Sequence, residues 1–381
     1  MRKLSLYVHI PFCQRKCHYC DFLSAPASGG EQKEYVKALC HEIRSEGKEY
    51  KGALIDTIFF GGGTPSLLTG VELGEIMTTL RENFAVEKDA EITLEVNPGT
   101  VDWERLKAWQ RHGINRLSVG LQSAANEELK ELGRIHTWEE FLTTWKSIRD
   151  CGFSNVNIDL MSALPGQTLT SYENTLRRVL ELRPEHISAY SLMIEEDTPF
   201  YRRFGRGGDE EYRLPSEEED RRMYERTKEL LGEAGYERYE ISNYSIPGYE
   251  CGHNTGYWTG KEYLGLGLGA SSYTGDMRFS RESKLEVYIC KILSGESTVV
   301  WQQRLDLQER MEEFMFLGLR MMRGVSPKRF KELFGIALEE RYEKQLIKLK
   351  EMGLLEETRE GRLALTERGI DVSNQVFVEF L

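Results

Sequence analysis

Residues 4–22, LSLYVHIPFCQRKCHYCDF, place an apolar segment directly before three closely spaced cysteines. Residues 4–10 are predicted to form a β-strand, and Cys13, Cys17 and Cys20 follow it in a C-x3-C-x2-C pattern. In a reducing compartment, such a cluster indicates metal binding or redox chemistry rather than a disulfide framework. The stretch therefore predicts a cysteine-bound metal site after the first strand.

The number of cysteines limits which metal site can form. No fourth cysteine follows nearby, whereas a structural zinc site takes four protein ligands, which His9 or His18 could complete. A four-iron cluster held by three cysteines leaves one iron free for another ligand. The aromatic residues of the loop, Phe12, Tyr19 and Phe22, favour a shielded cluster over zinc. Three cysteines without a shared role remain the third interpretation.

Strands and helices alternate through the first half of the chain. Strands are predicted at residues 4–10, 54–60, 91–96, 114–120, 155–161 and 186–194. Helices are predicted at residues 31–50, 71–84, 102–112, 126–150 and 169–182. Strands separated by helices in this way imply βαβ units and a parallel sheet. The pattern predicts an α/β fold, either a partial (β/α)6 barrel or a doubly wound sheet.

Each predicted strand ends in polar or glycine residues that could line one site. In parallel barrels the active site is built at the carboxyl ends of the strands. The glycines of residues 61–63 allow backbone N–H groups to approach a polar ligand closely. Glu95, Gln122 and Asp159 offer hydrogen-bonding groups, and Arg134 could pair with a carboxylate. Each of these residues alone also has a purely structural explanation.

Composition excludes several classes of protein. The 381 residues include 62 acidic and 50 basic side chains, a net charge of −12, which argues against a nucleic-acid partner. No apolar run approaches the length needed to cross a membrane, and the N-terminus lacks the features of a secretory signal. We therefore expect a soluble, cytoplasmic protein.

Several segments together resemble a known family. They are YVHIPFCQRKCHYCDF (residues 7–22), FGGGTPS (60–66), ITLEVNP (92–98), RLSVGLQS (116–123) and NVNIDLMSALPGQT (155–168). This set is similar to radical S-adenosylmethionine proteins, in the branch that contains the oxygen-independent coproporphyrinogen III oxidase. The resemblance implies a [4Fe–4S] cluster on Cys13, Cys17 and Cys20, whose open iron is chelated by the amine and carboxylate of S-adenosylmethionine.

The same resemblance assigns further residues by position. Those that match contacts to the cluster-bound cofactor are Tyr7, Tyr19, Gly62 and Glu95. Those that match contacts to a second S-adenosylmethionine in the oxidase are Gly63, Thr64, Gln122, Arg134, Asp159 and, through a weaker local motif, Met193. Whether a second molecule binds this chain is left open.

Two departures from the oxidase favour its haem chaperone branch. Only twelve residues precede Cys13, where the oxidase has a long extension, and Phe22 stands where the oxidase has a fourth cysteine. The chaperone branch is marked by an H-N-x-x-Y-W motif, which is present here as His253, Asn254, Tyr257 and Trp258. The resemblance implies a haem chaperone rather than the oxidase, although a radical enzyme acting on a tetrapyrrole remains the alternative.

The motif also has a chemical rationale for haem. An imidazole is a common axial ligand of haem iron, and aromatic side chains shield the macrocycle, so His253 is the candidate ligand. Asn254, Tyr257 and Trp258 are the candidate pocket residues. Cys251 is a second ligand, a covalent attachment site or a buried small side chain. The implied partners are haem and acceptor haemoproteins, with membrane-bound respiratory enzymes suggested by the family; a homodimer is left open.

The C-terminal part has a different organisation. We divide the chain into a barrel (residues 1–235), a connector carrying the motif (236–300) and a winged-helix-like α+β domain (301–381). The last part is predicted as helices at residues 307–322, from 326 and at 341–352, then a hairpin at 354–365. Residues 326–369 carry ten basic and nine acidic side chains, too few excess charges for a phosphate-binding role. We expect a lid over the barrel mouth, and a solvated loop at residues 202–222.

Overall fold

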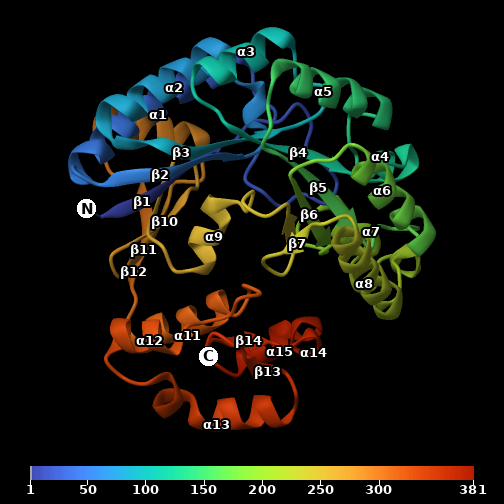
Figure 1. Ribbon diagram of the computed structural model, residues 1–381. Helices are drawn as coiled ribbons and strands as arrows, with labels where there is room; N and C mark the ends of the chain where they lie inside the picture. Colours follow the sequence, from blue (N-terminus) through green and yellow to red (C-terminus); the bar gives the residue numbers. More distant parts are fainter. Residues whose placement is uncertain (1) are drawn as a thin grey trace.

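A large open sheet organises the computed structural model, which describes residues 2–381 (Figure 1). Its strands lie in the order β12-β11-β10-β9-β1-β2-β3-β4-β5-β6-β8-β7. They are β1 (Lys3–Ile10), β2 (Leu54–Gly62), β3 (Ala85–Val96), β4 (Arg116–Gln122), β5 (Val156–Ser162), β6 (His186–Ser191), β7 (Glu237–Arg238), β8 (Asn243–Ser245), β9 (Tyr263–Leu266), β10 (Ser271–Thr274), β11 (Met277–Arg281) and β12 (Val299–Arg304). Strands β9 and β1 to β6 pair in parallel, and the outer strands pair antiparallel.

Helices cover the convex, outer face of the sheet (Figure 1). Those in the crossovers are α1 (Gly29–Glu49), α2 (Gly70–Asn83), α3 (Trp103–Arg111), α4 (Asn126–Glu131), α5 (Trp138–Cys151) and α6 (Leu169–Glu181), with the 3-10 turn η1 (Pro65–Leu67). After β6 follow α7 (Pro199–Phe204), η2 (Glu211–Arg213), α8 (Glu217–Glu233), α9 (Gly252–Trp258) and α10 (Leu285–Ser294). Helix α9 lies on the concave, inner side of the sheet (Figure 1).

The alternation of apolar and polar residues along the strands determines which face of the sheet packs against the helices. In β4, RLSVGLQ, Leu117, Val119 and Leu121 are fully buried in the main hydrophobic core, whereas the residues between them are polar or glycine. Since side chains on a strand point alternately to opposite faces, one face receives the helices and the other receives polar groups. The inner face is therefore free to hold a ligand.

The predicted strands and helices of the first half are confirmed to within a few residues. The doubly wound alternative is wrong, because the crossover helices cover only one face of the sheet. The sheet is open: in the described part of the chain β12 and β7 do not pair. The three-part division of the chain stays a prediction, but residues 237–304 add strands to both edges of the sheet instead of forming a separate connector.

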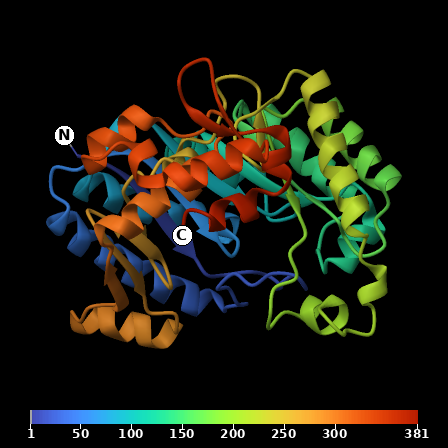
Figure 2. The same ribbon diagram turned by 90° about the horizontal axis from the view of Figure 1, so that it is seen from below.

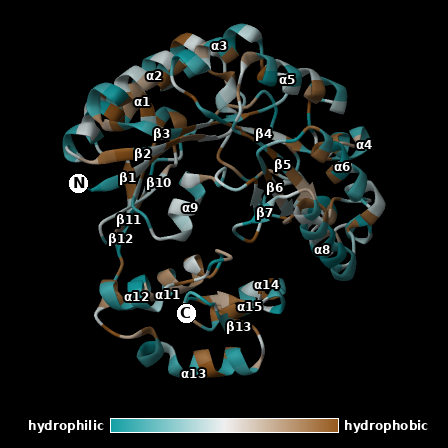
Figure 3. Ribbon diagram, in the orientation of Figure 1, coloured by the Kyte–Doolittle hydropathy of each residue, from teal (hydrophilic) through white to brown (hydrophobic). Residues whose placement is uncertain are grey.

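The predicted solvated loop at residues 202–222 is confirmed only for residues 205–216, which connect two helices through the 3-10 turn η2 and are mostly exposed or half-buried, and is wrong for both ends of the stretch. It contains the end of α7 and the start of α8, whose first turn is closed by a capping box between Ser216 and Glu219. The acidic first turn of α8 makes this helix strongly hydrophilic in sequence and in Figure 3, although Met223 and Leu231 on its inner side are fully buried. Acidic residues favour a helix N-terminus, so the acidic end of the polar run marks the start of α8, whereas the part before it is loop.

The C-terminal domain has the predicted winged-helix-like order of helices and a hairpin. Its elements are α11 (Leu307–Gly318), α12 (Pro327–Phe334), α13 (Leu338–Glu351), β13 (Leu355–Glu357), β14 (Leu363–Leu365), α14 (Glu367–Asp371) and α15 (Ser373–Val378). These elements enclose a hydrophobic core of their own around Phe330 and Leu349. The domain lies across the concave side of the sheet (Figures 1 and 2).

The C-terminal domain was expected over the barrel mouth, and this part of the prediction is wrong. The domain contacts the inner side of the sheet and the turn after β7, where the N–H of Met322 donates to the carbonyl of Tyr239 at 3.0 Å. The guanidinium of Arg320 also stacks on Trp258 of α9 at 4.3 Å. The cavity at the carboxyl ends of the strands is lined by residues from 13 to 190 only, so the domain covers α9 rather than the mouth.

A buried ion-pair network ties α1 to the edge strands of the sheet. Arg281 of β11 lies 3.1 Å from Glu42 and 2.9 Å from Glu46, and the side chains of Arg281 and Glu42 are only 2% exposed. Glu42 also accepts hydrogen bonds from the Tyr288 hydroxyl and the Thr298 hydroxyl, each at 3.0 Å. A buried charge that loses its partner is costly, so the network fixes the position of the β9–β11 ribbon.

Replacing one member of this network should destabilise the fold strongly. We expect Arg281→Met to lower the free energy of unfolding by about 3–5 kcal/mol, because Glu42 is left buried without its counter-charge. Lys146→Met is the matched control, since the Lys146–Asp150 pair is exposed and should contribute less than about 1 kcal/mol. Urea denaturation followed by circular dichroism measures both; equal effects would show that the buried pair is not a structural tie.

Candidate functional site

The sequence-predicted residues come together in one cavity at the carboxyl ends of the strands. Its volume is about 360 Å³, and it is half open to solvent through the cysteine loop. Eleven predicted site residues line it: Cys13, Cys17, Tyr19, Cys20, Gly62, Gly63, Thr64, Glu95, Gln122, Arg134 and Asp159. Residues from the ends of five strands and from the loops after them thus meet at one place.

Two predicted residues lie elsewhere. Tyr7 lines an adjoining cavity of about 260 Å³ that shares Gly62, Glu95 and Asp159 with the first one. Met193 follows β6, is 72% exposed and lines neither cavity. Its assignment as a contact to a second cofactor stays a prediction that this conformation does not support.

The three cysteine side chains are free and half-buried at the rim of the larger cavity. The Thr64 hydroxyl donates to Cys13 Sγ at 3.4 Å, and the Arg134 guanidinium donates to Cys17 Sγ at 3.5 Å. Burial raises the pKa of Cys20 to about 11, so a free thiol is favoured there until a cation binds. A metal cluster would deprotonate these thiols, and the two donors would stabilise the resulting sulfurs. The donor set therefore fits an iron–sulfur cluster.

The zinc alternative fits less well. His9 already uses both ring nitrogens, towards the Tyr7 hydroxyl at 3.0 Å and the Leu23 carbonyl at 2.8 Å. His18 Nδ1 is hydrogen-bonded to the carbonyl of Glu131 at 3.0 Å. Among the described residues, no three Cys, His, Asp or Glu side chains are grouped so that they could hold one metal ion.

The glycine run packs tightly against the cysteine loop. Gly62 has a φ of 110°, and a side chain there would meet the ring of His9 at 2.4 Å. A Cβ on Gly63 would lie 2.7 Å from the carbonyl of Phe12. Only glycine fits this close approach, which brings the Gly62 N–H within 3.1 Å of the Glu95 carboxylate.

Two half-buried carboxyl groups, Glu95 and Asp159, line the cavity. Burial, assisted by the nearby Asp159 carboxyl, raises the pKa of Glu95 to about 8, and the hydrogen bond from Gly62 opposes this only in part. Burial also raises the pKa of Asp159, which accepts hydrogen bonds from Asn157 at 2.7 Å and Ser118 at 3.2 Å. At neutral pH the cavity therefore offers a protonated Glu95 carboxyl that can both donate and accept hydrogen bonds.

The guanidinium of Arg134 is held in one position by hydrogen bonds to the protein. Its Nη2 donates to Asn97 Oδ1 at 2.8 Å and to the carbonyl of Gly120 at 2.5 Å, while Nη1 faces Cys17. Gln122, at the end of β4, has a φ of 74°, a left-handed conformation that is uncommon outside glycine and is often retained at functional sites. Both residues line the larger cavity, as predicted.

The H-N-x-x-Y-W motif forms helix α9, but its side chains do not line a common pocket. His253 is 1% exposed; its Nδ1 is hydrogen-bonded to the Thr57 hydroxyl and its Nε2 to the Tyr257 hydroxyl, both at 2.9 Å. Its ring stacks on Phe59 at 5.1 Å, and burial lowers its pKa to about 3. In this conformation His253 is a neutral, fully bonded core residue with no free nitrogen for a metal.

The other members of the motif face different surroundings. Asn254 lines the smaller cavity, and Trp258 is covered by Arg320 of the C-terminal domain. Cys251 is fully buried, with its Sγ 3.6 Å from Glu91 Oε1. Among the three roles left open for Cys251, its surroundings favour the buried small side chain.

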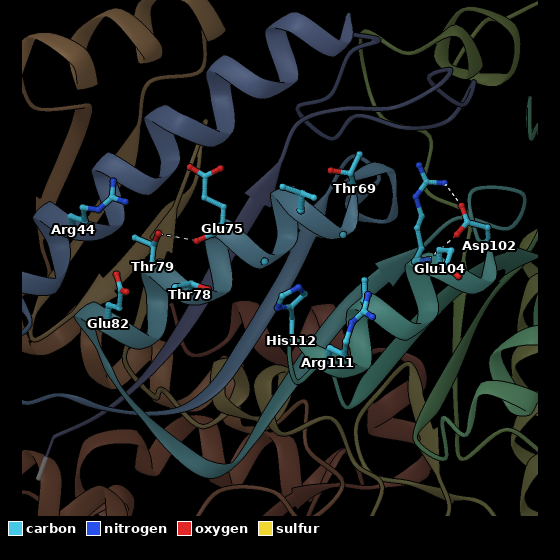
Figure 4. A pocket seen from close by; sticks show the side chains of 15 residues that line it. Arg44, Thr69, Glu75, Thr78, Thr79, Glu82, Asp102, Glu104, Arg111 and His112 are labelled. Carbon is cyan, nitrogen blue, oxygen red and sulfur yellow. Dashed lines mark hydrogen bonds and ion pairs between the residues drawn. The ribbon is translucent and has the colours of Figure 1, made fainter.

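A larger hollow, of about 950 Å³, lies on the outer surface between α1, α2 and α3 (Figure 4). Its labelled side chains are mostly charged residues of both signs that project towards solvent, such as Arg44, Glu82 and Arg111. It exists because glycines bring α2 close to α3: a Cβ on Gly74 would meet His112 at 2.6 Å. Since the sheet separates it from the cysteines, it is not part of the site.

Sequence reasoning missed the deeper polar residues of the inner face. Arg116, Asn157 and Ser188 line the smaller cavity and lie earlier in β4, β5 and β6 than the predicted residues. The strict polar–apolar alternation of RLSVGLQ in β4 could have revealed this layer, because every second residue of a strand lies on the same face. The prediction considered only the ends of the strands.

An open parallel sheet with three cysteines after its first strand and a polar inner cavity defines a radical S-adenosylmethionine protein. In agreement, the family model of the radical SAM superfamily matches residues 7–179, and that of the HemN C-terminal domain matches residues 305–372. The superfamily implies a [4Fe–4S] cluster and S-adenosylmethionine as cofactors.

The chain belongs to the HemW haem chaperone family. It is 36% identical to the heme chaperone HemW of Lactococcus lactis over 99% of this chain and 97% of the relative, and 36% identical to that of Bacillus subtilis over 99% of both. The solved coproporphyrinogen III oxidase HemN of Escherichia coli, a radical SAM enzyme, is 25% identical and superposes with a TM-score of 0.87 over all of this chain and 90% of that one.

The buried Glu95 carboxyl should make stability depend on pH in a defined direction. Because its folded pKa of about 8 lies above its ordinary value of 4.5, its contribution is complete below pH 4.5 and is lost as the pH rises through 8. We expect Glu95→Gln to unfold at higher temperature than the natural protein at pH 8, with the difference shrinking towards pH 5.

Thermal unfolding between pH 5 and pH 8 tests this expectation. The control is Glu104→Gln, since Glu104 is exposed at the start of α3 and should change the midpoint little at any pH. A Glu95→Gln variant whose stabilisation does not grow with pH would contradict a protonated Glu95 in the folded protein.

Proposed function

We propose that this protein is a haem chaperone that binds haem, carries an S-adenosylmethionine-ligated [4Fe–4S] cluster and transfers haem to acceptor haemoproteins. The observation that carries this proposal is the similarity to proteins named heme chaperone HemW over nearly the whole length of both chains. Acceptors of the membrane-bound respiratory type are proposed from the family resemblance. In the described residues no helix is long and apolar enough to span a membrane. A cytoplasmic location is part of the proposal.

Cys13, Cys17 and Cys20 are proposed as the cluster ligands, because they line the same cavity as the cofactor-contacting candidates. When bound, the cluster would supply an electron to S-adenosylmethionine and an open iron for its amino and carboxylate groups. The protein would orient that cofactor through the backbone of the glycine run and through Glu95, whose protonated carboxyl suits hydroxyl groups. The other proposed contacts are Tyr7, Tyr19, Gly63, Thr64, Gln122, Arg134 and Asp159.

The described conformation does not fit a haem on His253. Both ring nitrogens are hydrogen-bonded, and the neighbouring cavities of about 260 Å³ and 100 Å³ are too small for a porphyrin. We propose that His253 serves as the axial ligand only after Tyr257 has moved away from Nε2.

A radical enzyme acting on a tetrapyrrole is the second candidate function. It is favoured by the cavity beside the cysteines and by the similarity in fold to the Escherichia coli oxidase over the whole chain. Phe22, 64% exposed at the rim, stands where the oxidase has a fourth cysteine and favours the chaperone.

The role of His253 can be tested with two opposite substitutions. His253→Ala should weaken haem binding at least tenfold, whereas Tyr257→Phe should strengthen or accelerate it, because it frees Nε2 without removing the ring. Titration of haem followed at the Soret band measures both, with His41→Ala, an exposed residue of α1, as the control. Normal haem binding by His253→Ala with an unchanged cluster spectrum would falsify the axial assignment.

The cluster ligands predict a separate outcome. Cys17→Ser should abolish the anaerobically reconstituted cluster, whereas Cys290→Ser, at an exposed cysteine of α10, should leave about four iron atoms per chain. Iron analysis and the visible absorption spectrum measure this. Four iron atoms in the Cys17→Ser variant would rule out the three-thiolate site.

The two candidate functions differ in their products. Under reducing, anaerobic conditions with S-adenosylmethionine, the chaperone should transfer haem to an apo-haemoprotein and leave coproporphyrinogen III unchanged. Chromatography of the porphyrins after oxidation would detect protoporphyrin, whose formation would establish the enzyme instead.

A further inference from the structure

Arg116 is a fully buried arginine without a protein partner. It lies at the start of β4, is 2% exposed and points from the inner face into the cavity of about 260 Å³. Within the described chain its Nε makes no hydrogen bond, and its guanidinium has no carboxylate within 4.0 Å. Desolvation disfavours this charge, and Glu91 and Asp159 offset it through space without a direct hydrogen bond, so the guanidinium keeps donors that a ligand can occupy.

Other buried arginines of this fold have the hydrogen-bonding partners that Arg116 lacks. Arg281, also 2% exposed, has two carboxylates within 3.1 Å, and Arg134 donates to two oxygens and a sulfur. The acidic residues nearest to Arg116 are engaged elsewhere. Glu91 accepts from the N–H groups that start α9, and Asp159 accepts from Asn157 and Ser118.

The cavity in front of Arg116 is largely closed and mostly polar. Besides Arg116 its wall includes Asn157, Ser188, Tyr190 and, from the H-N-x-x-Y-W helix, Asn254. It continues into the cysteine cavity, since Phe22, Gly62, Glu95, Ser118, Asp159 and Tyr190 line both. A molecule in it would therefore lie beside whatever fills the cysteine cavity.

We propose that Arg116 is the carboxylate receptor of a binding site for a small organic acid, deep in the sheet and next to the cofactor cavity. A guanidinium binds a carboxylate through two parallel hydrogen bonds, and this group would satisfy the donors that no protein atom reaches. The neighbouring carboxyls Asp159 and Glu95 are hydrogen-bonding groups, so the ligand also carries an ammonium or hydroxyl group directed at them. The volume admits a small amino or hydroxy acid and excludes a porphyrin.

Two kinds of molecule carry a carboxylate together with an ammonium or hydroxyl group. The ligand is either the amino-acid end of a second S-adenosylmethionine, since that of the first is assigned to the open iron, or a separate small acid. The site is independent of haem transfer, because it uses neither His253 nor the C-terminal domain, so its failure and that of the proposed function are distinguishable.

The test is isothermal titration calorimetry on the reconstituted full-length protein in two arms. One arm titrates S-adenosylmethionine; the other titrates 5-aminolevulinate, L-glutamate and L-malate, which pair a carboxylate with an ammonium or hydroxyl group. Arg116→Met should weaken binding at least tenfold in one arm, and the arm affected identifies the source. Arg116→Lys, which keeps the charge but not the fork, should bind with intermediate affinity.

Controls separate a binding role from a structural one. Arg44→Met removes an exposed arginine of the hollow between α1, α2 and α3, and this variant should bind every probe as the natural protein does. Because Arg116 has no partner to leave behind, Arg116→Met should unfold at the same or a higher temperature than the natural protein. If Arg116→Met does not fold, the comparison rests on Arg116→Lys. The proposed site would be overturned if the natural protein and the Arg116 variants bound all probes alike. It would also be overturned if the natural protein bound none of them.

Discussion

The backbone pairing between the ends of β1 and β2 is the constraint on which the site depends. The N–H groups of Gly63 and Thr64 donate to the carbonyls of Ile10 and Phe12 at 2.8 and 2.7 Å, which fixes the start of the cysteine loop above the sheet. Side chains cannot fit between these segments, so glycine is required at this approach. The cysteines, the glycine backbone and Glu95 owe their common position to this single contact.

The inner face of the sheet explains why so many polar residues can be buried without disrupting the core. Helices bury the apolar face of every central strand, and the opposite face carries layers of hydrogen-bonded groups such as Asn157 and Asp159. Most of these groups satisfy one another, which is the condition for burying them. Arg116 stands out because its guanidinium has neither a hydrogen bond nor an ion pair among the described residues and faces a cavity, which is why we infer a ligand there.

Helix α9 shows the limit of a motif as evidence. Its sequence marks a haem-binding family, yet the fold closes His253 between Thr57 and Tyr257 and covers Trp258 with Arg320. The residues that close it come from β2 and from the C-terminal domain, far away in the sequence. Whether the side chains of a motif are accessible to a ligand depends on such partners, which the motif itself does not contain.

The sequence by itself determined the α/β class and most strand and helix positions, because periodicity and glycine or cysteine spacing are local properties of the chain. Its resemblance to a known family completed the set of eleven residues that line the 360 Å³ cavity. Only the tertiary structure decided that residues 237–304 extend both sheet edges, that Met193 lies outside the cavity and that Arg116 lacks a partner. These features depend on contacts between distant segments, and burial and hydrogen bonding exist only once those segments have packed together.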